Sequence, residues 1–315
     1  MIRRRLRLVV PPWSYGFTVA LAMWVATVAY SGIGSSGSIL DTALAFGAFS
    51  VLAGTGQMLV IASGPGNIDL SIPSVLTLAA YMAMKVMHGS DGLVAVGLLA
   101  GLLVGAAAGA LNFSAIAALR LPPIIATLAS SFIFESLAVD LGGETRVEPP
   151  PALSAFAVWR IADVQVMPLA VMVLTVIAAI VLRRTIFGRQ LLAAGQSEPA
   201  ATLAGIDVWR VRLLAYVLCG AAAALTGVLL AAFTGGAALN MGSSYLLTSI
   251  AVVVLGGTSV SGGQANAVGI WGAALFFELM TTMLNTFRFQ AGARFLLVGA
   301  LIIAIVAIVP KPRTT

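Results

Sequence analysis

The sequence predicts an all-α polytopic membrane protein, and its composition, its apolar runs and the placement of its arginines lead to this class. Of the 315 residues, 60% are hydrophobic and only 9% are charged, whereas soluble domains carry about a quarter charged residues. The mean hydropathy is +1.05. The 33 glycines suit helices that approach one another closely inside a bilayer. The net charge of +6 comes from arginines clustered beside apolar runs, which is typical of membrane orientation rather than nucleic-acid binding.

Apolar runs of the length that a bilayer requires, about 20 residues, recur along the whole chain. The predicted spans are 13–33, 39–62, 70–88, 92–119, 121–141, 164–182, 212–233, 245–257, 265–286 and 294–310. This gives about ten transmembrane helices in a single domain covering residues 1–315. The span 245–257 is short, so it is either a half-helix or a re-entrant element. The basic N-terminus has the layout of a signal peptide, but we interpret it as part of an uncleaved first helix because so many spans follow.

The distribution of basic residues predicts the orientation, because cytoplasmic loops of membrane proteins are enriched in Lys and Arg. With a cytoplasmic N-terminus, the inside segments hold Arg3, Arg4, Arg5, Arg7, Arg120, Arg183, Arg184, Arg189, Arg210, Arg212, Lys311 and Arg313. The outside segments hold only Lys85, Arg146, Arg160, Arg288 and Arg294. Both termini and the loop 182–212 are therefore expected in the cytoplasm. The loop 142–163, with Glu144, Glu148, Asp163 and three consecutive prolines, is expected to be a stiff extracytoplasmic connection.

Two stretches interrupt the apolar pattern at the depth of the membrane. They read SGPGNIDLSIPS at 63–74 and GGTSVSGGQAN at 256–266. Irregular backbone at such depth persists only where it is buried in protein or lines a wet cavity, and paired interruptions point to a translocation pathway. The alternative is that both stretches are ordinary loops at the membrane surface.

The loop 182–212 contains two short helical patterns. Phe187, Leu191 and Ala194 recur at helical spacing until Gly195, which we expect to end the first helix in a left-handed conformation. Ser197 is a favourable N-cap for a second helix, which would stop at Gly205. That helix has fewer than three turns, so it is not stable alone in water. We expect it to pack into a groove of another protein; the alternative is a linker that lies on the bilayer.

Several classes of chemistry are excluded by residues that the chain lacks. Cys219 is the single cysteine and His88 the single histidine, so an intrachain disulfide, a Cys or His metal cluster and a Ser-His-Asp arrangement are not expected. The only lysines are Lys85 and Lys311, and no G-x-x-x-x-G-K-[ST] sequence is present. We therefore predict no catalytic residues, no metal site and no cofactor, and any ATP that drives transport must bind to another polypeptide.

Four segments together resemble a known family. They read FGRQLLAAGQSEPAATLAGIDVWRVR, GQMLVIASGPGNIDLSIPSVLTLAA, LRLPPIIATLAS and SIAVVVLGGTSVSGG. Each is similar to a signature of the permease subunits of ribose/xylose/galactose-type ABC sugar importers. This family of binding-protein-dependent inner-membrane permeases also includes branched-chain amino acid permeases. The resemblance implies a bacterial inner-membrane protein that pairs with a second, identical or different, permease subunit. It also implies a cytoplasmic ABC ATPase and an extracytoplasmic solute-binding protein as partners.

The resemblance also assigns residues. The second short helix of the loop 182–212, between Ser197 and Gly205, corresponds to the cytoplasmic coupling helix of the family. The residues of this segment that would contact the ATPase are Gly195, Glu198, Ala200, Ala201, Leu203, Gly205 and Ile206. The residues near the translocation pathway would be Asp69, Ser71, Ser74 and Thr127. Asp69 has an alternative, structural role as a cap of the helix that starts near Leu70.

Some positions depart from the family pattern and bear on the solute. Pro65, Asn67 and Pro73 alter the segment 63–74. Glu135 and Glu278 lie within predicted spans, where a carboxylate is a candidate functional group, and Arg288 or Arg294 could pair with Glu278. A sugar is favoured, while a sugar alcohol, a nucleoside or another small polar solute stays open.

Three other functions remain as alternatives. A branched-chain amino acid permease ranks second, because the segments NIDLSIPS and LPPIIATLAS fit the sugar importers better. An ion-coupled secondary transporter would use Glu135 and Glu278 as its coupling acids, but it would leave the helix between Ser197 and Gly205 without a role. A membrane-bound enzyme ranks last.

Overall fold

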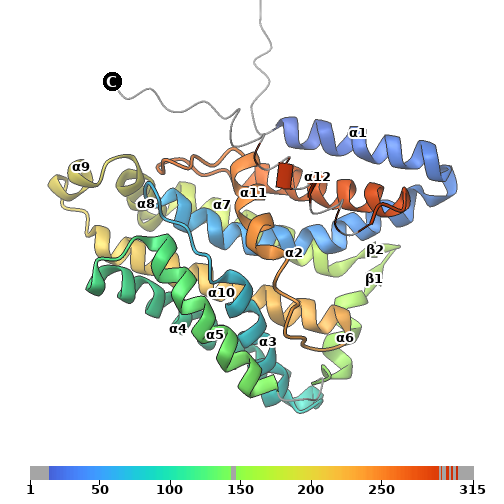
Figure 1. The fold of residues 1–315 in the computed structure, drawn as a ribbon, viewed down its shortest axis with the longest axis horizontal. Helices are drawn as coiled ribbons and strands as arrows, with labels where there is room; N and C mark the ends of the chain where they lie inside the picture. The colour runs from blue at the N-terminus through green and yellow to red at the C-terminus, as the bar shows by residue number, and fades with distance from the viewer. Residues whose placement is uncertain are drawn as a thin grey trace, which may run out of the picture.

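The computed structural model of the chain describes residues 14–142 and 147–290, together with positions 292, 296, 297, 299, 300 and 303. The described part is a bundle of long helices with one small hairpin (Figure 1). In chain order the elements are α1 (Ser14–Ser31), η1 (Ile33–Ser35), α2 (Ser36–Ala62), α3 (Ile72–Met87), η2 (Asp91–Leu93), α4 (Val94–Leu119), α5 (Pro123–Gly142), α6 (Pro151–Val158), β1 (Arg160–Ile161), β2 (Val164–Gln165), α7 (Val166–Arg184), α8 (Ile186–Gln196), α9 (Glu198–Leu203), α10 (Val208–Thr234), α11 (Tyr245–Leu255) and α12 (Ala267–Thr286).

The predicted spans agree with the helices wherever the structure describes them. Nine of them coincide with α1 to α5, α7 and α10 to α12, while most of the tenth, 294–310, lies outside the described residues, as do Arg146 and Arg294. Six helices, namely α2, α4, α5, α7, α10 and α12, are long and apolar enough to cross a bilayer. The helices α3 and α11 are apolar but have only 16 and 11 residues. The chain is thus a polytopic membrane protein, and the number ten stays a prediction.

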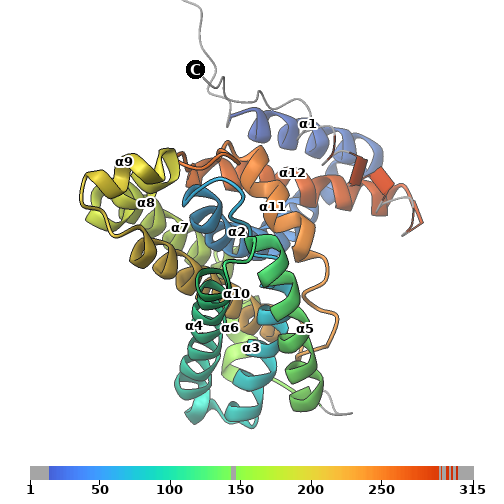
Figure 2. The same ribbon diagram turned by 60° about the vertical axis from the view of Figure 1, so that its left-hand side comes forward.

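Helix α2 forms the centre of the bundle. Its residues from Ala43 onward are almost all buried, and α10, α12, α11 and α7 pack around it. The helices α1 and α12 lie side by side over α2, on the side away from α3, α4 and α5 (Figures 1 and 2). The outer helices α4, α5 and α7 expose Leu103, Phe132 and Val173. Apolar side chains on the outside and a packed helix at the centre are what a lipid environment favours.

Glycines allow α4 and α10 to pack backbone against backbone. A Cβ atom added to Gly105 would lie 2.2 Å from the carbonyl oxygen of Gly220, and one added to Gly109 would lie 2.0 Å from that of Tyr216. Such distances leave no room for a side chain. Since lipid gives apolar helices no hydrophobic reason to associate, close packing of this kind is a main source of their attraction.

The first predicted interruption is buried inside the protein. After α2 ends at Ala62, the chain turns at Gly64 and Gly66, both with positive φ, and returns into the bundle. Asp69 reaches the level of Gln57 in α2, whose side-chain oxygen accepts a hydrogen bond from the Asp69 N–H at 3.3 Å. Helix α3 therefore starts within the bundle and not at its surface. Irregular backbone at this depth agrees with the sequence-based expectation that it must be enclosed by protein.

The predicted short span is the helical half of a longer, partly unwound segment. The Ala237 N–H donates to the carbonyl of Val147 at one end of the molecule, 3.4 Å away. A Cβ atom at Gly242 would lie 2.3 Å from the carbonyl oxygen of Pro73, so the unwound stretch 235–244 descends along the start of α3. Helix α11 then continues to the opposite end, where the Gly263 N–H donates to the Ala62 carbonyl at 2.9 Å (Figure 1). This segment leads from the end of the bundle near Val147 to the end near Ala62, which favours a half-helix over a re-entrant element.

The predicted loop 142–163 is more structured than a stiff connection. It contains helix α6 and the antiparallel β1–β2 hairpin, in which Arg160 pairs with Gln165. This hairpin is a small departure from an all-α fold. Arg160 also forms an ion pair of 2.6 Å with Asp41 at the start of α2. In Figure 1 the hairpin lies at one end of the long axis, and α8 and α9 lie at the other. Glu144 lies outside the described residues.

Candidate coupling site and translocation pathway

The segment after α7 folds as two short helices with well-defined caps. The side chain of Thr185 accepts from the Gly188 N–H at 3.2 Å and caps α8. The Ser197 hydroxyl accepts from the Ala200 N–H at 3.4 Å, which confirms the predicted N-cap of α9. Gly205 has a φ of +80° and ends the turn after α9, as the sequence predicts. The Asp207 side chain then caps α10.

The prediction for Gly195 is wrong, and the reason is a close contact. Helix α8 continues through Gly195 to Gln196, so this glycine does not end a helix in the left-handed conformation. A Cβ atom at Gly195 would lie 2.0 Å from the carbonyl oxygen of Ala62 and 2.4 Å from the nitrogen of Gly263. Gly195 is needed because three segments meet here without room for a side chain.

We call this meeting point the hinge junction. It comprises 195–198, 62–63 and 262–263. The Gly263 N–H donates to the Ala62 carbonyl, and the Gln196 side-chain amide donates to the Gly263 carbonyl at 3.3 Å. The junction therefore joins the start of α9 to the end of α2 and to the turn that precedes α12.

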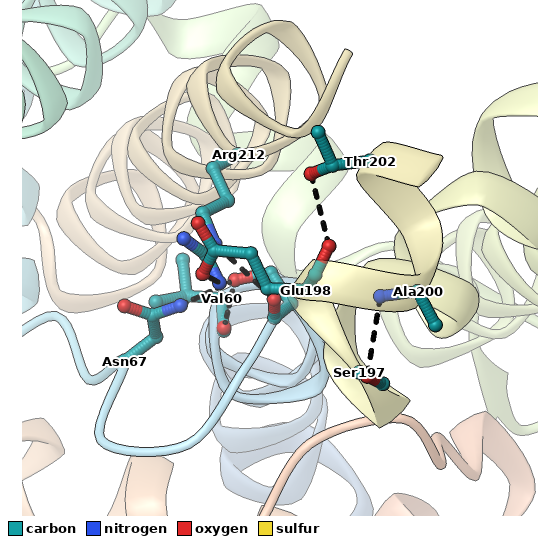
Figure 3. Close-up of polar contacts among 8 residues, drawn as sticks. Val60, Asn67, Ser197, Glu198, Ala200, Thr202 and Arg212 are labelled. Carbon is teal, nitrogen blue, oxygen red and sulfur yellow. Dashed lines mark hydrogen bonds and ion pairs between the residues drawn. The ribbon is translucent and has the colours of Figure 1, made fainter. Parts of the chain in front are cut away.

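Arg212 of α10 completes the hinge junction. Its guanidinium forms an ion pair of 2.8 Å with Glu198 at the start of α9, and its Nε donates to the Ser63 carbonyl at 3.3 Å. Figure 3 shows Arg212 between Glu198 and the turn that carries Asn67. The Asn67 amide donates to the Ser63 hydroxyl at 3.0 Å. One arginine thus connects α9, α10 and the end of α2, a role that the sequence analysis did not foresee.

The coupling residues predicted from the family resemblance divide into two groups. Glu198, Ala200, Leu203 and Gly205 are exposed, and Leu203 is 90% exposed. Ala201 is only 4% exposed and packs with Ala194, Ile206 and Val208, and Gly195 is buried in the hinge junction. Gly195 and Ala201 therefore fasten this segment to its own chain, and the exposed group forms its free surface.

Three of the predicted pathway residues belong to a buried polar cluster. The Asp69 carboxylate accepts from the Ser71 N–H at 2.8 Å, from the Ser71 hydroxyl at 2.6 Å and from the Asn112 amide at 3.3 Å. Thr127 accepts from the Leu70 N–H at 3.0 Å. Ser130 donates to the Asn112 side-chain oxygen. Asp69 is 2% exposed, and Ser71, Asn112 and Thr127 are fully buried.

This cluster favours the structural role for Asp69. Its carboxylate holds the backbone just before α3, and Asn112 and Thr127 fasten the same stretch to α4 and α5. Asn112 was missed by the sequence analysis, although a lone amide in the apolar run 92–119 is a detectable signal, because polar side chains in spans bond between helices.

The other predicted pathway residues line two cavities. Ser74 and Glu135 border a cavity of about 340 Å³ between α3, α5 and the unwound stretch, together with Ser131, Asn240 and Ser243. We call it the α3–α5 cavity. Glu135 is exposed there. The unwound stretch was missed because its letters GGAALNMGSS read as an ordinary loop.

Glu278 borders a second cavity, of about 350 Å³, on the other side of the same stretch. Its neighbours include Ser244, Tyr245, Thr248 and Thr281. We call it the Glu278 cavity. The Ser50 hydroxyl donates to the Glu278 carboxylate at 3.0 Å. The expected pairing with Arg288 is not among the ion pairs of the described residues, and Arg294 lies outside them. Ser50 was not predicted.

The described residues contain no group of three or more His, Cys, Asp and Glu side chains that could hold a metal ion. Within the described residues, six helices long and apolar enough to cross a bilayer, together with a partly unwound segment between two cavities, define a multi-pass membrane protein.

Comparison with known proteins gives the family. A model described as "Branched-chain amino acid transport system / permease component" matches residues 38–306. The chain is 30% identical over 293 residues to the Autoinducer 2 import system permease protein LsrC of Enterobacter sp. (strain 638), covering 93% of this chain and 84% of that one. It is 32% identical over 242 residues to the Ribose import permease protein RbsC of Bacillus subtilis (strain 168), covering 76% and 74%. No solved structure matches. The chain belongs to this permease family, as the sequence resemblance indicates.

Proposed function

We propose that this chain is the membrane-spanning subunit of a bacterial ABC importer for a monosaccharide or a similar small polar solute. It spans the inner membrane about ten times with both termini in the cytoplasm, and it pairs with a second permease subunit. A binding protein delivers the solute from outside, and a separate ATPase subunit supplies the energy. Relatives named for ribose and autoinducer 2 import support this solute class over branched-chain amino acids.

The hinge junction is the observation that carries the proposal. A force applied to α9 reaches the ends of α2 and of the turn before α12 through Gly195, Gln196 and the Arg212 side chain, without a long loop between them. Coupling between distant sites needs elements that shift between discrete arrangements. A rigid connection at the hinge junction is suited to transmit such a shift to the segment between the two cavities.

The exposed side of α9 favours a protein partner over the bilayer surface. Leu203 projects from a six-residue helix, and two arginines of the segment are engaged by acidic neighbours. Arg212 pairs with Glu198, and Arg210 pairs with Asp207 at 2.9 Å. If this helix lay on anionic lipid, such arginines would contact the lipid phosphates and would not pair with acidic side chains. The paired arginines leave Leu203 as the projecting apolar contact of α9.

The unwound stretch 235–244 is the proposed wall of the solute path. It lies between the α3–α5 cavity and the Glu278 cavity, each bordered by several hydroxyl groups. Half-helices that start at mid-depth expose backbone groups able to bind polar solutes. A sugar, which offers hydroxyls in several directions, matches such a lining. In the paired permease, the path would form between two copies of these elements.

Reconstitution in proteoliposomes tests the proposal. The chain, its ATPase and its binding protein are combined, and uptake of labelled ribose is measured with ATP, with ADP, and with a proton or sodium gradient alone. We expect uptake only with ATP. Uptake on an ion gradient without ATP would instead support the secondary transporter that uses Glu135 and Glu278.

A further inference from the structure

An apolar groove lies on the outer side of the bundle, away from the solute path. It has a volume of about 580 Å³ and lies between α7, α12, α2 and the start of α1. Ligand pockets have volumes of about 300–1,000 Å³. The side chains of Phe17, Val176, Ala179, Trp271, Arg183 and Arg184 border it. We call it the α7–α12 groove.

The length of the groove matches one leaflet of a bilayer. Along α7 it extends from Met172 to Arg184, which corresponds to about 18 Å at 1.5 Å per residue. Half of a hydrocarbon core of about 30 Å is about 15 Å. Arg183 and Arg184 are the last residues of α7 and adjoin α8. The groove therefore starts at the end of the bundle assigned to the cytoplasm and ends near mid-membrane.

Two arginines form the charged end of the groove. Arg183 and Arg184 are both exposed, and neither forms an ion pair with an acidic side chain of the described residues. The other bordering residues are apolar apart from Thr175. Two guanidinium groups present several N–H donors in a geometry that suits phosphate oxygens. A lipid with an additional cationic headgroup would be repelled by the second arginine.

Trp271 supplies an independent observation. It borders the groove in the second turn of α12 and is only 7% exposed, yet its indole Nε1 has no hydrogen-bond partner among the described residues. Buried polar groups are normally bonded. The nitrogen itself is not accessible from outside the protein, so Trp271 presents its ring, and not its N–H, to the groove. Tryptophan is also enriched at the membrane interface.

We propose that the α7–α12 groove binds one anionic phospholipid of the cytoplasmic leaflet. Its phosphate contacts Arg183 and Arg184, its glycerol region lies beside the ring of Trp271, and one acyl chain lies along Val176 and Ala179. The proposal rests on the orientation given in the proposed function and on no other part of it. The bound lipid fills the space between α7 and α12, the helix that carries Glu278.

Native mass spectrometry of the purified, delipidated chain tests this site. The probes are phosphatidylglycerol and phosphatidylcholine with identical acyl chains. A cation near an anionic lipid contributes about fivefold in affinity, and two contribute about 30-fold. We expect phosphatidylglycerol to bind about 30-fold more tightly than phosphatidylcholine. The R183Q/R184Q variant should lose this preference, R183K/R184K should retain most of it, and A179W should weaken both lipids by blocking the acyl chain.

The matched control is R189Q/R210Q, which removes two exposed arginines of the same cytoplasmic segment that do not border the groove. It should bind phosphatidylglycerol like the unchanged chain. Equal affinity for the two lipids, or an equal loss in both double variants, would overturn the proposal. V176W replaces A179W if the latter lowers the unfolding temperature.

A groove-filling variant that dissociates a dimer would instead identify the groove as an interface between copies of the chain. No ATPase or solute is present, so failure here is separate from failure of the proposed function.

Discussion

Two irregular stretches enter the helix bundle, and they differ in how their polar groups are used. At the stretch 63–71, Asp69, Ser71 and Asn112 bond to one another in a buried cluster, and Thr127 accepts from the Leu70 N–H. In 235–244, Asn240, Ser243 and Ser244 border cavities on two sides. A satisfied buried network rigidifies the structure, whereas hydroxyls and amides that face a cavity are free to bind a polar solute. The comparison shows that an interruption of an apolar run does not by itself identify a pathway.

Removal of the acceptor in the first stretch should have the largest effect. Asp69→Ala leaves the Ser71 N–H and hydroxyl buried without the oxygen that accepts from both, while the Asn112 amide keeps its bond to Ser71. Each unsatisfied buried donor costs about 1–3 kcal/mol. We expect little folded protein, measured by fluorescence-detected size-exclusion chromatography with heating. Asp69→Asn keeps one acceptor oxygen and should lose less. Normal thermal stability of the alanine variant would show that the cluster is not structural.

A bulky residue in the second stretch should affect transport and not stability. Ser243→Trp places an indole in the α3–α5 cavity. We expect the rate of ATP-driven uptake to fall at least about tenfold, because the indole blocks the path or displaces the solute from its binding position. The unfolding temperature should stay nearly constant. Ser136→Trp, on an exposed position of α5 that does not border this cavity, is the control and should transport normally. A similar loss in both variants would count against the assignment of the cavity.

The carboxyl group of Glu278 should have an intermediate effect. Glu278→Gln retains an acceptor for the Ser50 hydroxyl but removes the ionisable group beside Tyr245 and Thr248. We expect a several-fold change in the solute concentration for half-maximal uptake, since hydrogen bonds to charged groups exceed those to neutral ones by about 1 kcal/mol. Uptake should still require ATP. If the unchanged chain took up solute on a proton gradient and Glu278→Gln abolished this uptake, the ion-coupled alternative would be favoured.

The ion pair of the hinge junction should contribute least to stability. Glu198 is half-exposed in its side chain and Arg212 is mostly buried, and exposed pairs are worth about 0.2–1 kcal/mol. A double-mutant cycle with Glu198→Gln and Arg212→Gln should give a coupling energy in that range from thermal unfolding. Stimulation of the ATPase by solute should nevertheless decrease in both single variants. If solute stimulates the ATPase equally in the variants and in the unchanged chain, Arg212 does not take part in coupling.

The sequence predicts the elements well and their mutual contacts poorly. Apolar runs locate nine helices, six of them long enough to cross a bilayer, because a helix in lipid must be apolar, and Ser197 identifies the start of α9 because its cap is local. Gly195 was misinterpreted because a close contact with Ala62 and Gly263 leaves no local signal. The roles of Arg212, Ser50 and the stretch 235–244 depend on residues far away in the chain, which periodicity and capping rules do not report.

Site-specific crosslinking at α9 tests the central claim, that a nucleotide-hydrolysing partner binds this helix. The variant carries L203C and C219A, so that its cysteine is unique, and is expressed with the ATPase in membranes. The control is I33C/C219A, whose cysteine replaces an 85% exposed apolar residue outside the segment assigned to the cytoplasm. We predict a crosslink to the ATPase from position 203 that changes with ATP, and none from position 33. Reaction of the position 203 cysteine with lipid-soluble reagents only, with no crosslink to the ATPase, would contradict the account.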